Sequence, residues 1–534
     1  MTPRRTKTLR MPPQPAEPLR VQHPRAAGID GHAAQHWVAV PPEAAPPPPA
    51  DHPPNLPSHV RRFGACTADL EALADWLTAC GVTTVAMEST GVSWIPLFEL
   101  LERRGFQVFL VDPRQTRQVS GRPKTDVLDC QWIQRLHSYG LLAASFRPED
   151  QVVVLRGYRR QRHRLLRHAG QHVQHLQKAL EQMNVKLAEV VSDVTGVTGL
   201  AIIRAILRGG RDPLELAELR HDKCHHTESE IARALYGNWR DEHLFALRQA
   251  LELYEAYQAK LRDCDDCIER HLRTFADRSG GRKLDQKARR RRRPRHEPAF
   301  DVRAALFRFR GVDLTVIEGV DRTTALTILG DIGCDMSQRP TVKHFVSWLG
   351  LCPQHQGSAG QIKSRHTRRG ANPAARALRL AAQGCHHAKN ALGAFYRRIQ
   401  ARCGGPKAVV ATARKIAERV YRLLKYGEAY VRQEMAAAEE AYRARVLKGW
   451  RARRRDWATR WCRPRRNRRW RGRDALRQAL GWKLTKSSRG TCKAGVQHGE
   501  GEVVSRAAER TVFSLRYIMF LLGLFLGRLP KITS

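Results

Sequence analysis

The chain has 534 residues, and its 94 Lys and Arg residues against 51 Asp and Glu residues give a formal net charge of +43 at pH 7. That length excludes a single small domain and predicts several modules. The excess positive charge predicts a polyanionic partner, with nucleic acid as the leading candidate, because each neutralised phosphate releases condensed counterions. A basic chain whose charge serves only solubility is the alternative.

The cysteine pattern and the two ends of the chain indicate in which cellular compartment the protein is expected. The 12 cysteines show no disulfide-like spacing, and residues 1–25 are rich in Pro and Arg and do not resemble a signal peptide. We therefore expect a reducing compartment, the bacterial cytoplasm, with association to the nucleoid. The apolar run at 517–526 is about ten residues long, whereas roughly 20 are needed to span a bilayer, so no membrane segment is expected.

An α/β domain is predicted over residues 26–150, after a disordered basic arm at 1–25. Apolar runs typical of strands occur at 26–30, 37–40, 61–66, 82–87 and 107–111. Helical spacing of apolar residues occurs at 67–79, 95–104 and 125–139. The Pro- and Ala-rich segment 41–57 is expected to be a surface insertion. This order of strands and helices predicts a mixed α/β sheet.

The remainder of the chain is expected to be mostly helical. Heptad seams at 166–194 and 247–268 predict two long helices within a coiled-coil linker at 151–277, paired either as an antiparallel hairpin or between subunits. A basic flexible linker is expected at 278–299 and a helical domain at 300–461. Residues 462–534 form a basic tail that we expect to be disordered.

Four acidic residues are expected to meet at one edge of the predicted sheet. Asp30 ends the first strand, Glu88 ends a central strand, and Asp126 and Asp129 share one face of the helix at 125–139. Clustered carboxylates repel one another unless divalent cations lie among them, and oxygen ligands suit Mg²⁺ or Mn²⁺. Two such ions stabilise the attacking and leaving oxygens in phosphodiester transfer. The alternative is that each acid is a capping or surface residue.

Two motifs of the predicted helical domain suggest contacts with phosphate. The segment 317–326 is similar to a helix-hairpin-helix, in which Gly319 lets backbone amides approach a phosphate, although a plain helical turn fits equally well. Ser358 lies in a loop of small residues, and it is either an exposed nucleophile or an ordinary loop serine. The basic residues that follow it, expected to hold phosphate charge, are Lys363, Arg365, Arg368, Arg369, Arg376 and Arg379.

Three stretches together resemble the DEDD-type insertion-sequence transposases. They are Gly28-Ile29-Asp30, residues 85–92, and residues 121–132 followed by Gly140-Leu141-Leu142. The resemblance covers roughly residues 26–453 in the family's own order, which is an RNase H-like domain, a coiled-coil linker and a helical transposase domain. It implies a fold like that of Holliday-junction resolvases, with Asp30, Glu88, Asp126 and Asp129 as the metal-binding tetrad. Arg122 and Lys124 would then meet a phosphate backbone.

The same resemblance implies a mechanism and partners. Ser358, which follows a Gly-Leu-x-Pro stretch, would be the nucleophile that becomes covalently joined to DNA, and Ser364 is the competing serine in the loop. An element-encoded structured guide RNA that pairs with donor and target DNA, and assembly as dimers or tetramers, are also implied. The chain departs from the family at Ser93, at Pro123 and in its extension past Arg453.

The expected function is therefore that of a DNA transposase that uses Mg²⁺ or Mn²⁺ and a serine–DNA intermediate. A structure-specific endonuclease that uses only the four acids is the first alternative. A non-catalytic nucleic-acid-binding protein from a decayed element is the second. A zinc site at Cys264 and Cys267 is disfavoured, because Cys264 falls in a heptad seam.

Overall fold

A computed structural model of the protein describes residues 20–462 apart from 51, 90, 117–124, 286–295, 334, 355, 359–360, 365, 369 and 371. The chain separates into two units, one ending at Lys448 and the other beginning at Gly449. None of the helices in the described part combines the length and apolar character that a bilayer crossing requires.

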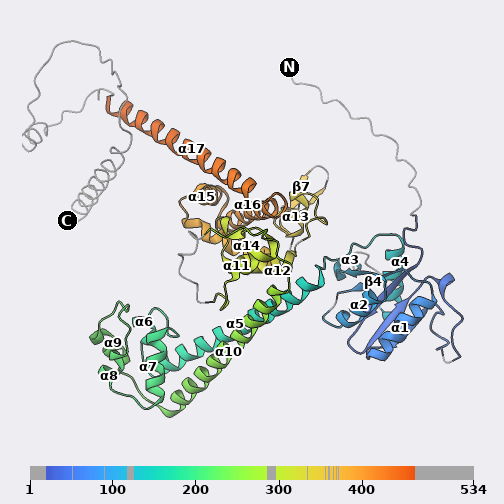
Figure 1. Cartoon of the computed structure of the whole chain (residues 1–534), viewed down its shortest axis with the longest axis horizontal. Helices are drawn as coiled ribbons and strands as arrows, with labels where there is room; N and C mark the ends of the chain where they lie inside the picture. The colour runs from blue at the N-terminus through green and yellow to red at the C-terminus, as the bar shows by residue number, and fades with distance from the viewer. Residues whose placement is uncertain are drawn as a thin grey trace, which may run out of the picture. The chain divides into compact units, whose positions relative to one another are not determined.

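The first unit begins with a five-stranded mixed sheet (Figure 1). Its order is β3-β2-β1-β4-β5, in which the β1–β2 and β2–β3 pairs are antiparallel and the β1–β4 and β4–β5 pairs are parallel. The strands are β1 (Ala26–Gly31), β2 (Gln35–Ala39), β3 (Val60–Gly64), β4 (Thr84–Glu88) and β5 (Gln107–Val111). The prediction of a mixed α/β sheet is confirmed, and β5 has the predicted bounds.

Helices cover both faces of this sheet. Ile29 and Met87 point to the face that packs against α1 (Thr67–Ala79) and α2 (Trp94–Arg103). The other face packs against α4 (Asp126–Ser138), where Ala86 shares an apolar cluster with Ile133. Gly28 faces α4 as well, and a Cβ at this position would lie 2.1 Å from the backbone nitrogen of Gln134. The strand therefore needs a glycine here for α4 to approach closely.

Alternation along the strands decides where the acids at their ends lie. Successive side chains of a strand point to opposite faces, so Asp30 shares the α4 face with Gly28, and Glu88 shares it with Ala86. The first turn of α4 carries Asp126. The fold thus directs acids from two strands and one helix into the same layer.

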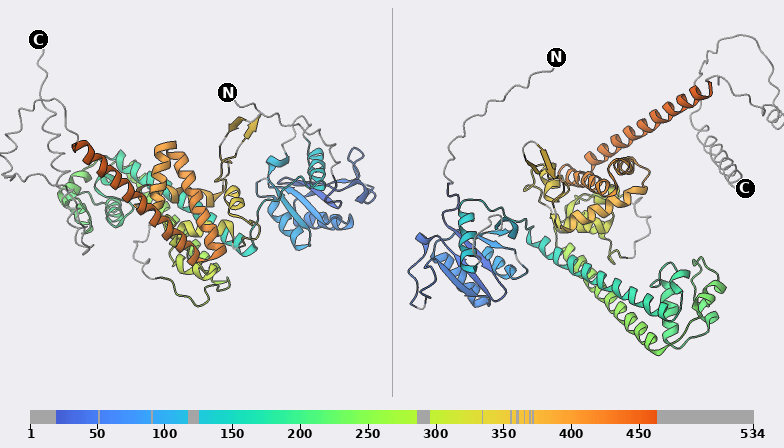
Figure 2. Two further views of the ribbon diagram at one scale, coloured as in Figure 1. Left: turned by 90° about the horizontal axis from the view of Figure 1, so that it is seen from above. Right: turned by 180° about the vertical axis from the view of Figure 1, so that it is seen from behind.

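The two long helices form an antiparallel hairpin within one chain. α5 (Asp150–Gln182) and α10 (Asp241–Arg273) lie side by side in both views (Figures 1 and 2). Their direction follows from the pairing of Arg162 with Asp265 and of Tyr158 with His271. Of the two arrangements that the sequence left open, the structure has the hairpin.

The prediction of one heptad stretch through residue 194 is wrong at its end. α5 stops at Gln182, and Asn184 adopts a left-handed conformation with φ 58°. The later members of the predicted seam lie in α6 (Leu187–Val190) and the turn after it. There they join α7 (Val197–Leu207), α8 (Pro213–Glu218) and α9 (Glu228–Leu235) in a separate apolar cluster.

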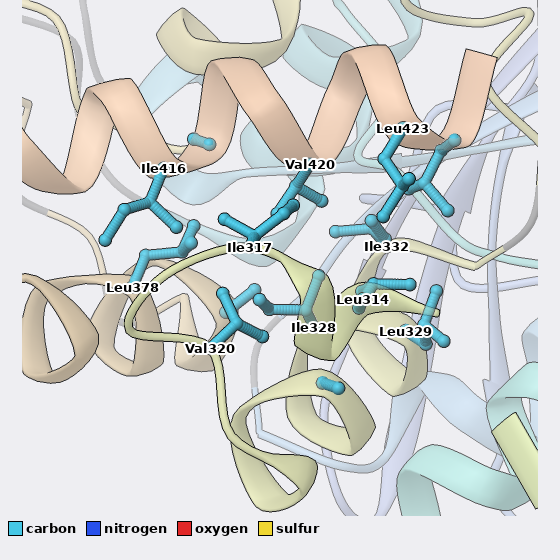
Figure 3. Packing of buried hydrophobic residues seen from close by; sticks show 14 of the residues in the cluster. Leu314, Ile317, Val320, Ile328, Leu329, Ile332, Leu378, Ile416, Val420 and Leu423 are labelled. Atoms are coloured by element: carbon cyan, nitrogen blue, oxygen red, sulfur yellow. The ribbon is translucent and has the colours of Figure 1, made fainter. Parts of the chain in front are cut away.

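A larger apolar cluster holds the helices that follow residue 300 (Figure 3). In Figure 3, Ile416, Val420 and Leu423 of α16 (Gly405–Tyr426) face the segment around Ile317. The other elements of this part are α11 (Val302–Arg310), η3 (Leu314–Val316), α12 (Arg322–Ile332), α13 (Val342–Trp348), α14 (Pro373–Gly384), η4 (Cys385–His387), α15 (Ala391–Cys403) and α17 (Glu428–Cys462). A small hairpin of β6 (Gln356–Ser358) and β7 (Gln361–Ser364) follows α13.

Buried ion pairs fasten α5 to α12. The Arg159 guanidinium donates to the Asp331 carboxylate at 2.7 Å, and both side chains are less than one-tenth exposed. Arg156 donates to the backbone oxygens of Gly330 and Asp331. Burial lowers the pKa of Arg156 to about 10, opposed by the nearby Asp331 carboxylate. Removal of Asp331 would take away the negative charge that compensates the guanidinium groups of Arg156 and Arg159 in this desolvated site.

Asp331→Ala should therefore lower the free energy of unfolding by about 3–5 kcal/mol, the usual cost of breaking a buried pair. Chemical denaturation of the full chain measures this change. The matched control is Glu255→Ala, which removes the exposed pair with Arg204 and should cost about 0–1 kcal/mol. Equal losses for the two variants would contradict the assignment of the α5–α12 contact to the buried pair.

Candidate metal centre at the sheet edge

The first turn of α4 is built to carry negative charge. Thr125 caps the helix, since its Oγ1 accepts a hydrogen bond from the backbone N–H of Leu128 at 3.3 Å. Asp126 and Asp129 both lie in this first turn. Their charges interact favourably with the positive end of the helix dipole. The local sequence Thr-Asp-x-x-Asp therefore both starts the helix and places two carboxylates on one face of it.

Asp30 lies at the centre of the acidic group. Its side chain is 13% exposed. Burial raises the pKa of Asp30 above its usual value, and the negative charges of Glu88, Asp129 and Asp126 raise it further, while His32 opposes them. The four acids predicted from the sequence are thus close enough for three of them to act on the fourth. An ionised Asp30 is unfavourable here unless a positive charge compensates it.

Glu88 is oriented by a neighbour that the sequence did not indicate. The Thr116 hydroxyl, at the end of α3 (Pro113–Thr116), donates a hydrogen bond to Glu88 Oε1. The backbone oxygen of Thr116 in turn accepts a hydrogen bond from the indole of Trp132 on α4 at 3.1 Å. α3 therefore ties the β4 acid to the helix that carries the other two.

Sequence reasoning missed His32. This residue follows β1 in the turn to β2, and its Nε2 lies 3.4 Å from Asp30 Oδ2 and 3.4 Å from Asp126 Oδ1. The signal available in the sequence was the spacing Asp30-x-His32 at a strand end. His32 is two residues after Asp30 and is the first residue beyond the strand.

The residues present fit a divalent cation. One ligand atom from each of Asp30, His32 and Asp126 lies within 4.8 Å of the other two. Carboxylate oxygens and an imidazole nitrogen are common ligands of divalent metals. A bound cation would also relieve the repulsion that raises the pKa of Asp30.

The serine loop is described only in part. Ser358 ends β6, with its backbone paired with Gln361 of β7, and its side chain lies outside the described residues. Lys363 in β7 is exposed, as is Arg368, which lies 3.7 Å from the Asp112 carboxylate. Arg379 of α14 donates to the backbone oxygen of Gly350, and Arg376 is exposed. Outside the described residues lie Arg122, Lys124, Arg365 and Arg369.

Gly319 has a structural reason to be glycine. It has φ 85°, and a Cβ there would lie 2.9 Å from Cys385 Sγ and 3.0 Å from the backbone oxygen of Ala381. The next helix, α12, is capped by Asp321, whose carboxylate accepts from the backbone N–H of Thr324 at 2.6 Å. The segment 317–326 is preceded by a single 3-10 turn, η3. Phosphate binding by Gly319 stays a prediction.

Replacing Asp30 with Asn should stabilise the cation-free protein. The pKa of Asp30 is raised above the value of 3.8 for an unperturbed Asp, so ionisation of Asp30 disfavours the folded state at neutral pH. The difference in melting temperature between Asp30→Asn and wild type should shrink as pH falls through the raised pKa and vanish below 3.8, where the carboxyl is neutral in both states.

Added Mn²⁺ should stabilise wild type and leave the stability of Asp30→Asn unchanged. At about 100 times its dissociation constant a cation adds about 2.7 kcal/mol to the stability of a protein that binds it, so wild type should gain and Asp30→Asn should not. Thermal unfolding with and without cation measures both effects. Asp75→Asn, which changes an exposed acid on α1, is the control and should behave as wild type does. A loss of stability in cation-free Asp30→Asn would refute this account of the site.

Two parts of the chain match models of transposase families. Residues 27–185, which include the sheet from the second residue of β1 onward, the four acids and the whole of α5, match a family described as transposase. Residues 313–397, which include the serine loop, match the transposase IS116/IS110/IS902 family. A search of curated proteins found no match. Both models belong to transposases and follow each other along one chain, so the protein is a member of the IS110 family of DEDD transposases.

Proposed function

We propose that this transposase cuts and rejoins the DNA of an insertion sequence through a divalent cation held by its acids and a covalent serine–DNA intermediate. The observation that supports the proposal is the approach of Asp30 on a strand to Asp126 on a helix, inside the matched transposase segment, with Glu88 and Asp129 near enough to raise the pKa of Asp30. The strand order β3-β2-β1-β4-β5 with three antiparallel strands supports an RNase H-like domain.

The acids hold the cation and do not themselves react. Bound at Asp30 and Asp126, Mg²⁺ or Mn²⁺ would supply positive charge to the oxygens of the phosphodiester. Glu88, fixed by Thr116, faces the same layer as Asp30. Because α4 begins within this group, its capped N-terminus places Asp126 and Asp129 beside Asp30, where the helix dipole interacts favourably with negative charge.

Ser358 is the proposed nucleophile. Its hydroxyl oxygen attacks the phosphorus, so an O–P bond to the serine forms and the bond from phosphorus to one sugar oxygen breaks. That sugar oxygen leaves as a hydroxyl and takes up the proton that the serine gives up. A sugar hydroxyl of the second strand then attacks the same phosphorus, which joins the strands and restores the serine. Lys363 and Arg368 provide positive charge beside this loop.

DNA is the substrate that the family implies, and the net charge of +43 suits a large nucleic-acid surface. We further propose that an element-encoded structured RNA guides the choice of DNA, and that the enzyme acts as a homodimer or tetramer. Both parts of this proposal rest on the resemblance to the family.

The covalent intermediate gives a direct test. Purified full-length protein incubated with labelled element-end DNA, the cognate RNA and Mg²⁺ should yield a protein–DNA band that survives denaturation. Ser358→Ala should abolish this band and strand exchange, with a loss of at least about 10³-fold, since activated nucleophiles cannot be replaced by an apolar side chain. The matched control Ser364→Ala, in the same hairpin, should retain both.

The other functions predict different results. A nuclease that uses only the acids would still cut DNA after Ser358→Ala and would form no adduct in wild type. A non-catalytic binding protein would lose no activity on Asp126→Ala. An adduct that persists in Ser358→Ala and disappears in Ser364→Ala would move the nucleophile to Ser364 and overturn the assignment.

A further inference from the structure

We propose that His32 is a nitrogen ligand of the cation at the sheet edge, in addition to the four acids; this inference rests on the proposed function of that site. The imidazole lies in the turn between β1 and β2, where the backbone N–H of His32 donates to the backbone oxygen of Gln35 at 3.0 Å. This short turn brings the residue back over the end of β1, where Asp30 lies.

The nitrogen of His32 faces two carboxylates that come from distant parts of the sequence. Its Nε2 is 3.4 Å from an oxygen of Asp30 on β1 and 3.4 Å from an oxygen of Asp126 on α4. Metal–ligand bonds of about 2.1 Å place adjacent ligands of an octahedral ion about 3 Å apart. The observed separations of 3.4 Å are slightly wider than this spacing, so the donor atoms leave room for one ion between them.

Hydrogen bonding does not account for this arrangement. An N–H···O hydrogen bond to a carboxylate spans about 2.7–3.2 Å, and a single imidazole nitrogen carries at most one hydrogen. Both separations exceed the usual range of a hydrogen bond and fall within the distance of an ion pair. A cation placed between the three atoms would take the lone pair of the imidazole nitrogen and compensate both carboxylates at once.

The exposure of the three side chains is consistent with a ligand role. Asp30 is 13% exposed, whereas His32 and Asp126 are 46% and 43% exposed. A cation could therefore enter from the solvent side, past His32 and Asp126, and reach the buried carboxylate last. The exposed side of the ion would remain open to water or phosphate oxygens, which a catalytic site requires.

A nitrogen ligand changes which metal the site prefers. Mg²⁺ favours a shell of oxygen atoms, whereas imidazole favours transition metals, and Mn²⁺ accepts both. The site should bind Mn²⁺ more tightly than Mg²⁺, and the difference should depend on His32. In a site made of the four acids alone, the preference would not depend on this residue.

Electron spin-echo spectroscopy of Mn²⁺ bound to the full-length protein tests the assignment without measuring activity. Wild type should show modulation from a directly bound ¹⁴N nucleus, and the pattern should change to that of ¹⁵N when only the histidines are labelled. His32→Asn should lose the modulation and weaken Mn²⁺ binding at least about tenfold, the lower end of the effect seen for residues around a metal. Mg²⁺ binding, measured by calorimetry, should change less.

Two further variants separate the outcomes. His32→Asp supplies an oxygen in place of the nitrogen, so it should restore Mn²⁺ binding without modulation. His36→Gln changes the histidine that faces Gly31 across β1 and β2 and should keep the modulation. The His32 proposal is refuted, while the acidic site stands, if three results occur together: wild type binds Mn²⁺, Asp30→Asn does not bind it, and wild type shows no ¹⁴N modulation. If wild type binds no Mn²⁺, the metal site of the proposed function fails as well.

Discussion

The burial of Asp30 beside other carboxylates at one edge of the sheet is the constraint on which the candidate site depends. Asp30 is nearly buried, and the charges of Glu88, Asp126 and Asp129 all oppose its ionisation. A folded protein tolerates such a group only when a compensating charge is available or when function requires the strain. The proposed cation site therefore lies where an ionised Asp30 costs the folded domain stability.

The rest of the first domain keeps these charges together. Close packing of α4 over Gly28 holds the helix that carries Asp126 against the strand that carries Asp30. Thr116 links Glu88 to the same helix through Trp132. Farther along the chain, the Arg159–Asp331 pair fixes α5 to α12, so the long hairpin is anchored in the core of the helical part. Each of these contacts joins segments distant in sequence.

Local sequence pattern predicted most of the elements, because apolar spacing of two or near 3.6 residues reflects which face of an element is buried. The bounds of α1 and β5 agree with the prediction, and the four acids lie at the predicted strand ends and helix. The heptad pattern wrongly predicted that Leu187 and Val194 continue the long helix. The backbone turns at Asn184, and the apolar residues after it pack in a different hydrophobic cluster. The spacing of apolar residues indicates that a residue is buried, but it does not indicate against which part of the protein the residue packs.

The pattern of strands and helices, the four candidate acids and the resemblance of the chain to a transposase family could all be read from the residues alone. The folded chain was needed to see that α5 and α10 pair with each other, that Thr116 donates to Glu88, and that His32 lies near both Asp30 and Asp126. The physical reason is the range of the interactions. Capping and amphipathic spacing act over a few residues, whereas this group of side chains is assembled across the packed faces of a strand and a helix that lie far apart along the chain.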